Sequence, residues 1–103
     1  MPTPDEAYAA AEKLKDEGKL EEAVAALEAV VAEHPEFALA HSALSAWCTR
    51  LERHEKAVAH ARRVCELEPT EPFSFTALSV ACMKAGKIPE AEEALARARM
   101  MQG

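Results

Sequence analysis

The sequence predicts an all-α fold in which one helix–turn–helix unit occurs three times. Apolar residues recur at helical spacing, and almost no segment alternates apolar and polar residues as a strand would. The sequence also repeats internally, because shifting it against itself by 34 residues aligns several columns of like residues. The identical columns are Ala23, Ala57 and Ala91; Pro35 and Pro69; and, two steps apart, Gly18 and Gly86.

The length of 103 residues matches three units of about 34 residues each. We expect one domain with repeats at approximately 4–37, 38–71 and 72–103. The first unit opens on Thr3-Pro4-Asp5-Glu6, which combines a Thr cap, a proline in the first turn and a Glu three residues after the Thr. This start signal predicts a helix that continues through Leu14 and ends near Gly18.

The second helix of the first unit is expected from about 20 to 33, because Pro35 blocks its continuation. The second unit repeats this pattern over 37–67 and the third over 71–101. Glu52 stands where the other two units have a turn glycine.

A 34-residue helical hairpin with this pattern resembles the tetratricopeptide repeat. The resemblance rests on the three columns above, on Leu44-Ser45 and Leu78-Ser79, and on Phe75, which stands where the family often has Trp. It covers essentially the whole chain. It implies a right-handed α-solenoid of six helices and a protein–protein interaction adaptor. The sequence has no Gly-rich phosphate loop and suggests no Ser-His-Asp set, so we expect no enzymatic activity and no cofactor.

The resemblance further implies that one stripe of each first helix lines a concave groove that binds peptides. In the second and third units this stripe is neutral and mildly apolar. The predicted groove residues are Tyr8, Leu39, Ser42, Thr49, Phe73, Thr76, Val80 and Met83. An equally weighted alternative is that the stripe is ordinary helix surface, with small residues where neighbouring helices pack on it and solvated residues where it is charged.

Chaperone-binding members of the family grip a C-terminal carboxylate with Lys, Asn and Arg on the first helices. None of the matching positions here offers a cation, so we do not expect a carboxylate clamp. Those positions hold Tyr8, Glu12, Ala43, Phe73 and Ala77.

A second hypothesis is a self-assembling subunit whose terminal faces stack. Residues 1–38 hold ten acids and three bases, whereas residues 73–103 hold three acids and four bases. An acidic first unit would therefore attract a mildly basic last unit in a head-to-tail contact. The sequence shows no capping helix after the third unit, so under this hypothesis we expect a homo-oligomer, either a dimer or a larger assembly. The predicted self-association residues are Leu95, Ala98, Met100 and Met101.

The third hypothesis is a metal site made by Cys and His residues. Cys48, Cys65 and Cys82 fall on packing faces, so we expect buried core thiols and no metal. His41 with Cys48 is the best available pair of metal ligands. His54 and His60 are six residues apart, which places them on different sides of a helix and excludes a zinc-protease HExxH motif. Trp47 is expected in the core against the first unit.

Composition narrows the function further. The net charge of −6 argues against nucleic-acid and anionic-membrane binding, because no excess of cations exists to displace counterions. The N-terminal residues lack the features of a signal peptide, and no apolar run is long enough to span a membrane. Three cysteines without a CxxC pair suit a reducing compartment, so we expect a cytoplasmic protein.

Overall fold

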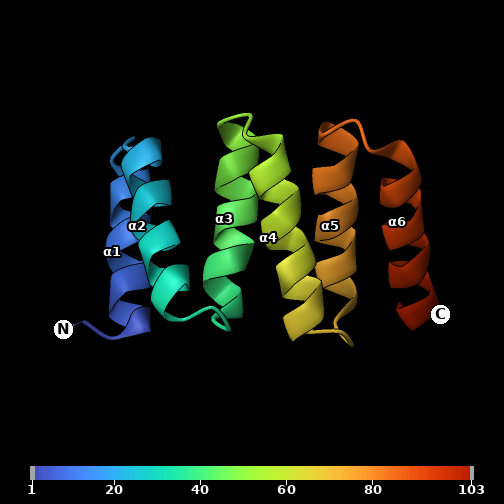
Figure 1. Cartoon of the computed structure of the whole chain (residues 1–103), viewed down its shortest axis with the longest axis horizontal. Coiled ribbons are helices and arrows are strands. Elements are labelled where there is room, and N and C mark those ends of the chain that lie inside the picture. The colour runs from blue at the N-terminus through green and yellow to red at the C-terminus, as the bar shows by residue number, and fades with distance from the viewer. Residues whose placement is uncertain (1, 103) are drawn as a thin grey trace.

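The structure is a computed structural model that describes residues 2–102. Within this range the chain forms six α-helices and no strand, which confirms the all-α prediction. The helices form three antiparallel pairs in an elongated stack of 42 × 25 × 20 Å, with the two termini at opposite ends (Figure 1). The helices are α1 (Pro4–Asp16), α2 (Leu20–Glu33), α3 (Ala38–Arg50), α4 (His54–Leu67), α5 (Pro72–Lys84) and α6 (Ile88–Gln102).

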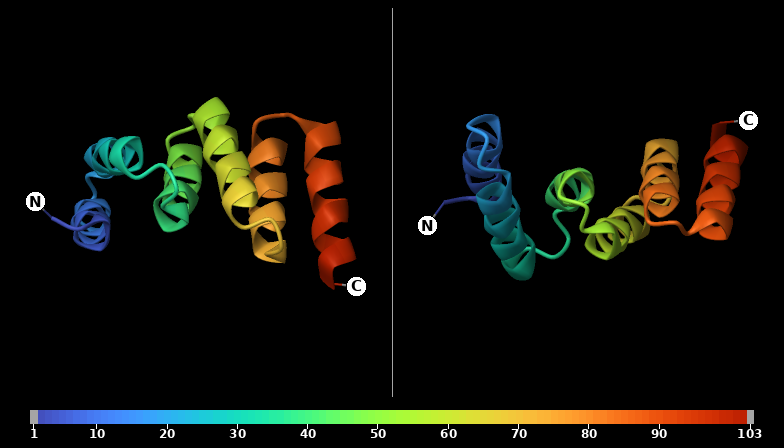
Figure 2. Two further views of the ribbon diagram at one scale, coloured as in Figure 1. Left: turned by 60° about the horizontal axis from the view of Figure 1, so that its bottom comes forward. Right: turned by 90° about the horizontal axis from the view of Figure 1, so that it is seen from above.

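Each pair follows the previous one in chain order, so α2 packs on α3 and α4 packs on α5 (Figure 2). This arrangement is an all-α repeat solenoid. At its start, the Glu6 backbone N–H donates to Thr3 Oγ1 (3.1 Å) and the Thr3 N–H donates to Glu6 Oε1 (2.9 Å). The predicted capping signal is therefore present, and it satisfies donors that the first turn of a helix otherwise leaves free.

The turn inside each pair is the same C-terminal motif in all three repeats. Its central residue has a positive φ: 83° at Gly18, 59° at Glu52 and 79° at Gly86. In each turn the following N–H reaches back to a carbonyl five residues earlier, as Arg53 does to Cys48 at 2.8 Å. The repeat therefore requires a left-handed residue here, and Glu52 adopts that conformation without being a glycine.

The two helices of a pair approach closely through the predicted alanine column. Ala23, Ala57 and Ala91 each have 0% exposed surface. In the second pair Ser45 Oγ donates to the carbonyl of Ala57 at 2.9 Å. In the third pair Ser79 Oγ donates in the same way to Ala91 at 2.7 Å. The first pair has the fully buried Ala11 at the equivalent position, so it packs there without this hydrogen bond.

The three cysteines are buried, as predicted. Burial raises the pKa of the Cys65 thiol to about 11, and the Cys65 Sγ–H donates to the Ser74 carbonyl at 3.3 Å. Trp47 lies in the buried cluster with Ala11 and Ala23, which confirms its predicted place against the first pair.

Surface ion pairs connect each helix pair to the next at equivalent repeat positions. They are Glu21–Arg53 (3.9 Å) and Glu28–Lys56 (3.3 Å) at the first junction, and Glu55–Lys87 (3.4 Å) and Arg62–Glu90 at the second. Arg62 occupies the repeat position of Glu28, and Glu90 occupies that of Lys56, so this ion pair recurs with its charges exchanged.

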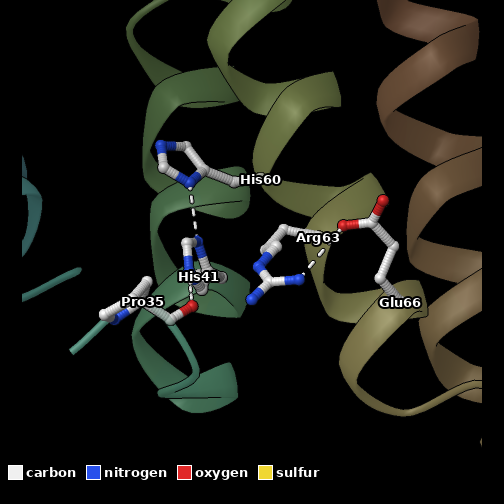
Figure 3. A network of polar contacts seen from close by, with 5 residues as sticks. All are labelled: Pro35, His41, His60, Arg63 and Glu66. Atoms are coloured by element: carbon white, nitrogen blue, oxygen red, sulfur yellow. Dashed lines mark hydrogen bonds and ion pairs between the residues drawn. The ribbon is translucent and has the colours of Figure 1, made fainter. Parts of the chain in front are cut away.

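Two histidines face each other near the junction of the first and second pairs (Figure 3). His41 Nε2–H donates to the Pro35 carbonyl at 2.8 Å, because a carbonyl can only accept. The Nδ1 atoms of His41 and His60 are 3.0 Å apart, so in the neutral pair His60 Nδ1–H donates to His41 Nδ1. Figure 3 also shows the exposed Arg63–Glu66 ion pair on the next turns of α4.

We predict that replacing Glu52 with glycine stabilises the fold. Glycine adopts a positive φ without the steric cost that a side chain imposes, although it loses more entropy on folding. The expected gain in the free energy of unfolding is about 0.5–1 kcal/mol, measured by urea denaturation. Gly86→Ala is the matched control and should be destabilised by a similar amount. An unchanged or lower stability for Glu52→Gly would contradict this account of the turn.

We also predict that stability falls as the pH decreases below about 6.5 because of the histidine pair. Burial, and secondarily the charge of His41, lowers the pKa of His60 below its usual 6.5. The unfolded chain therefore takes up this proton first, so the free energy of unfolding declines from about pH 6.5 toward the lower pKa of the folded state. His60 is partly exposed, so solvent screens its charge and we expect only a small decline in the free energy of unfolding. The measurement is urea denaturation of wild type and of His60→Gln at several pH values. If the free energy of unfolding declines equally with falling pH in the two proteins, His60 does not cause the decline.

Candidate functional site

A cavity of about 490 Å³ opens between the second and third helix pairs. Its walls come from α3 and α5, its floor from α4, and most of its lining is apolar or small. The lining residues are Ser42, Ser45, Ala46, Thr49, Ala61, Val64, Glu68, Glu71, Phe73, Ser74, Ala77, Val80 and Ala81.

The side chains at the two junctions explain why this cavity lies here. At the first junction Leu27 and Trp47 lie in one buried cluster and are 0% and 6% exposed. At the second junction the equivalent residues are Ala61 and Ala81, and both line the cavity. Because a leucine and a tryptophan are replaced by two alanines while the helices stay in register, the second junction is hollow.

Four of the predicted groove residues lie together in this cavity: Ser42, Thr49, Phe73 and Val80. Phe73 and Val80 are 75% and 51% exposed. Leu39 and Met83 are half-exposed on the same two helices but do not line the cavity.

The two other predicted residues lie elsewhere. Tyr8 packs edge-to-face against Phe37, the residue that precedes α3, with ring centroids 6.3 Å apart, so it belongs to the packing between the first and second pairs. Thr76 is half-buried, and its Oγ1 donates back to the Pro72 carbonyl at 3.3 Å within α5.

The stripes predicted on the first helices do not include the lining that α4 contributes. Ala61 and Val64 come from that helix, and Glu68 and Glu71 from the segment that follows it. One sequence signal could have revealed the floor: Ala61 is the small member of a repeat column that otherwise holds Leu27 and Leu95. Residues of a second helix reach the groove because each pair packs on the next.

The charged residues that line the cavity are all acidic. Glu68 and Glu71 are exposed at its edge, and no Lys or Arg is among the lining residues. Glu71 also caps α5, since its carboxylate accepts from the Phe73 N–H at 3.4 Å. The cavity therefore combines an apolar interior with a negative edge.

The predicted self-association residues are divided by the structure. Ala98 is only 1% exposed and packs with Cys65 and Phe75, so it presents no surface to a partner. Leu95 is half-buried, whereas Met100 is 82% exposed. Met100 and Met101 line a shallow hollow on α6.

The structure does not bring the proposed metal ligands into one site. Both ring nitrogens of His41 are directed at Pro35 and His60, and Cys48 is fully buried. Within residues 2–102 no group of three or more His, Cys, Asp or Glu side chains is arranged to hold a metal ion. In the same part of the chain, no helix has both the length and the apolar character needed to cross a bilayer.

Solved structures share this fold at low sequence identity. MamA from Desulfovibrio magneticus RS-1 superposes with a TM-score of 0.84 at 18% identity, over 96% of this chain and 56% of that chain. The CopN–Scc3 complex matches with a TM-score of 0.87 at 15% identity, over 95% of this chain and 58% of that one. This chain thus spans little more than half the length of these relatives.

A third solved structure is similar in length. The second TPR of Spaghetti (RPAP3), bound to the HSP90 peptide SRMEEVD, matches with a TM-score of 0.82 at 17% identity, over 95% of this chain and 91% of that chain. No curated protein matches the chain in sequence. In sequence, residues 8–72 match the tetratricopeptide repeat family. The chain therefore belongs to the tetratricopeptide repeat family.

Proposed function

We propose that this protein is a protein-interaction adaptor that binds a segment of a partner in the cavity between α3 and α5. The observation that carries the proposal is the hollow junction, where Ala61 and Ala81 replace the leucine and tryptophan of the first junction. A cavity of about 490 Å³ is large enough for one or two apolar side chains.

The groove edge supports the same proposal. Phe73 and Val80 expose apolar surface beside the cavity, and a ligand would remove that surface from water. Each fully buried side chain of Leu or Phe size contributes roughly 1.5–3 kcal/mol before the cost of ordering the ligand. The expected ligand is an extended or helical segment with two apolar anchors.

The acidic edge favours basic residues next to those anchors. A Lys or Arg in the ligand would lie near Glu68 or Glu71, with no base of the groove to repel it. The RPAP3 domain, in contrast, is solved with the acidic peptide SRMEEVD. The clamp positions of this chain hold no cation, and two of them, Phe73 and Ala77, form apolar lining. We therefore propose that it does not bind acidic C-terminal tails.

Val80→Glu is expected to weaken peptide binding by at least tenfold, because a carboxylate at the cavity wall must lose water when an apolar anchor enters. The probe is a fluorescein-labelled peptide with a Leu-Phe centre flanked by lysines, followed by fluorescence polarisation. The same peptide flanked by glutamates should bind more weakly. Met100→Glu introduces the same charge at an exposed apolar residue of α6 and should leave binding unchanged. Equal affinities for wild type and Val80→Glu, or a preference for the acidic peptide, would contradict the proposal.

Ala61→Leu separates stability from binding. The new leucine copies Leu27 and Leu95 of the other repeats and occupies part of the cavity. It should raise the free energy of unfolding by about 1 kcal/mol and lower affinity for the lysine-flanked peptide about tenfold. A stabilised protein that still binds normally would show that the ligand uses another surface.

A further inference from the structure

Because the sequence repeats, each residue at an inner junction has an equivalent residue at an end of the solenoid, and the two can be compared. At the first junction Val24 of α2 lies in one buried cluster with Trp47 of α3, and at the second Val58 of α4 lies in one with Ala81 of α5. Each cluster contains the same two repeat positions, one on a second helix and one on the following first helix.

A second set of equivalent positions lies about two turns away on each helix. Val31 and Ala40 belong to the packed cluster of the first junction. At the second junction the equivalent residues are Cys65 and Ser74, which are in direct contact through the 3.3 Å hydrogen bond. Inner junctions therefore use apolar or small residues at all four positions.

At the two ends the same positions carry charges. On α6 the residues equivalent to Val58 and Cys65 are Glu92 and Arg99. On α1 the residues equivalent to Ala81 and Ser74 are Lys13 and Glu6. All four are exposed, and none takes part in an ion pair within the described residues 2–102.

We propose that a second copy of this chain docks its α1 on α6 and continues the solenoid head to tail. In the register of the inner junctions, Glu92 faces Lys13 of the second copy and Arg99 faces its Glu6. Both contacts are attractive. With α1 turned end for end, Glu92 would face Glu6 and Arg99 would face Lys13, so the charges select one direction.

The remaining surfaces are consistent with this contact. Leu95, half-buried in one copy, occupies the repeat position of the fully buried Leu27, and in the assembly the methylene stem of the second copy's Lys13 covers it. The acidic residues 1–38 attract the slightly basic residues 73–103, whereas two α1 faces would repel each other. The peptide groove lies between the second and third pairs and stays open in the assembly.

The association should be weak and dependent on salt. The inner ion-pair positions do not continue, because Pro89 replaces Glu55 and Ala96 replaces Arg62 at the end of the solenoid. Exposed charge pairs each contribute little and are screened by ions. We expect a dissociation constant on the order of 100 μM at low ionic strength.

The test is sedimentation velocity of the full chain up to about 1 mM, a concentration that detects dissociation constants of millimolar order. Wild type should form dimers and longer species at about 0.05 M salt and dissociate at about 1 M salt. Glu92→Lys alone and Lys13→Glu alone should each weaken association about tenfold, since each places like charges together. Equimolar mixing of the two variants should restore association, because each tail then meets a head of opposite charge.

Glu93→Lys is the matched control, since it makes the same charge change at the neighbouring exposed residue that lines the α6 hollow. It should associate as wild type does, and circular dichroism verifies that every variant folds. A wild-type monomer at all concentrations would overturn the proposal. Equal effects of Glu93→Lys and Glu92→Lys on association would also overturn it, as would the absence of rescue when the two variants are mixed. A Lys13→Glu variant that associates as wild type does would overturn it too, because it would indicate contact between two α6 faces.

Discussion

The two helices of every pair approach closely because the second helix has an alanine, Ala23, Ala57 or Ala91, at the point of contact. A larger side chain at this point would force the helices apart and change the direction in which the next pair begins. In two pairs a serine opposite the alanine donates to its carbonyl, which fixes the helices along their length as well as their separation. The position of every later helix, and therefore of the groove, depends on this contact.

A constant pair geometry leaves the junctions between pairs free to vary. The first junction has Leu27 and Trp47 in one buried cluster, and Lys15 adds a cation–π contact with its Nζ 5.6 Å from the Trp47 ring centroid. The second junction has Ala61 and Ala81 and is hollow. Filling such a hollow with apolar side chains would stabilise the protein, so its retention is consistent with a binding role. Under the proposed function, stability and binding make opposite demands on the same two positions.

Much of the fold could be predicted from the sequence because its signals are local. Thr3 and Glu6 begin α1, and Gly18 and Gly86 end first helices through a conformation that glycine adopts readily. Only part of the groove could be predicted from the sequence. Ser42 and Val80 could be placed by helical spacing alone, but Tyr8 is drawn into contact with Phe37, and Ala61 reaches the cavity from another helix. Those outcomes depend on side-chain sizes across a junction, which a periodicity within one helix does not contain.

The exchanged ion pair shows how nearly identical repeats are kept in order. Glu28 pairs with Lys56, and one repeat later Arg62 pairs with Glu90. If the third pair packed directly on the first, Glu90 would face Glu28, and two carboxylates would repel each other. Exposed pairs of this kind add only about 0.2–1 kcal/mol each, so they contribute little to total stability. Instead, they favour one order of packing over others that the shared alanine and serine contacts would make equally favourable. By the same means, charges at the end faces, Glu92 and Lys13 among them, can select the orientation of a second copy.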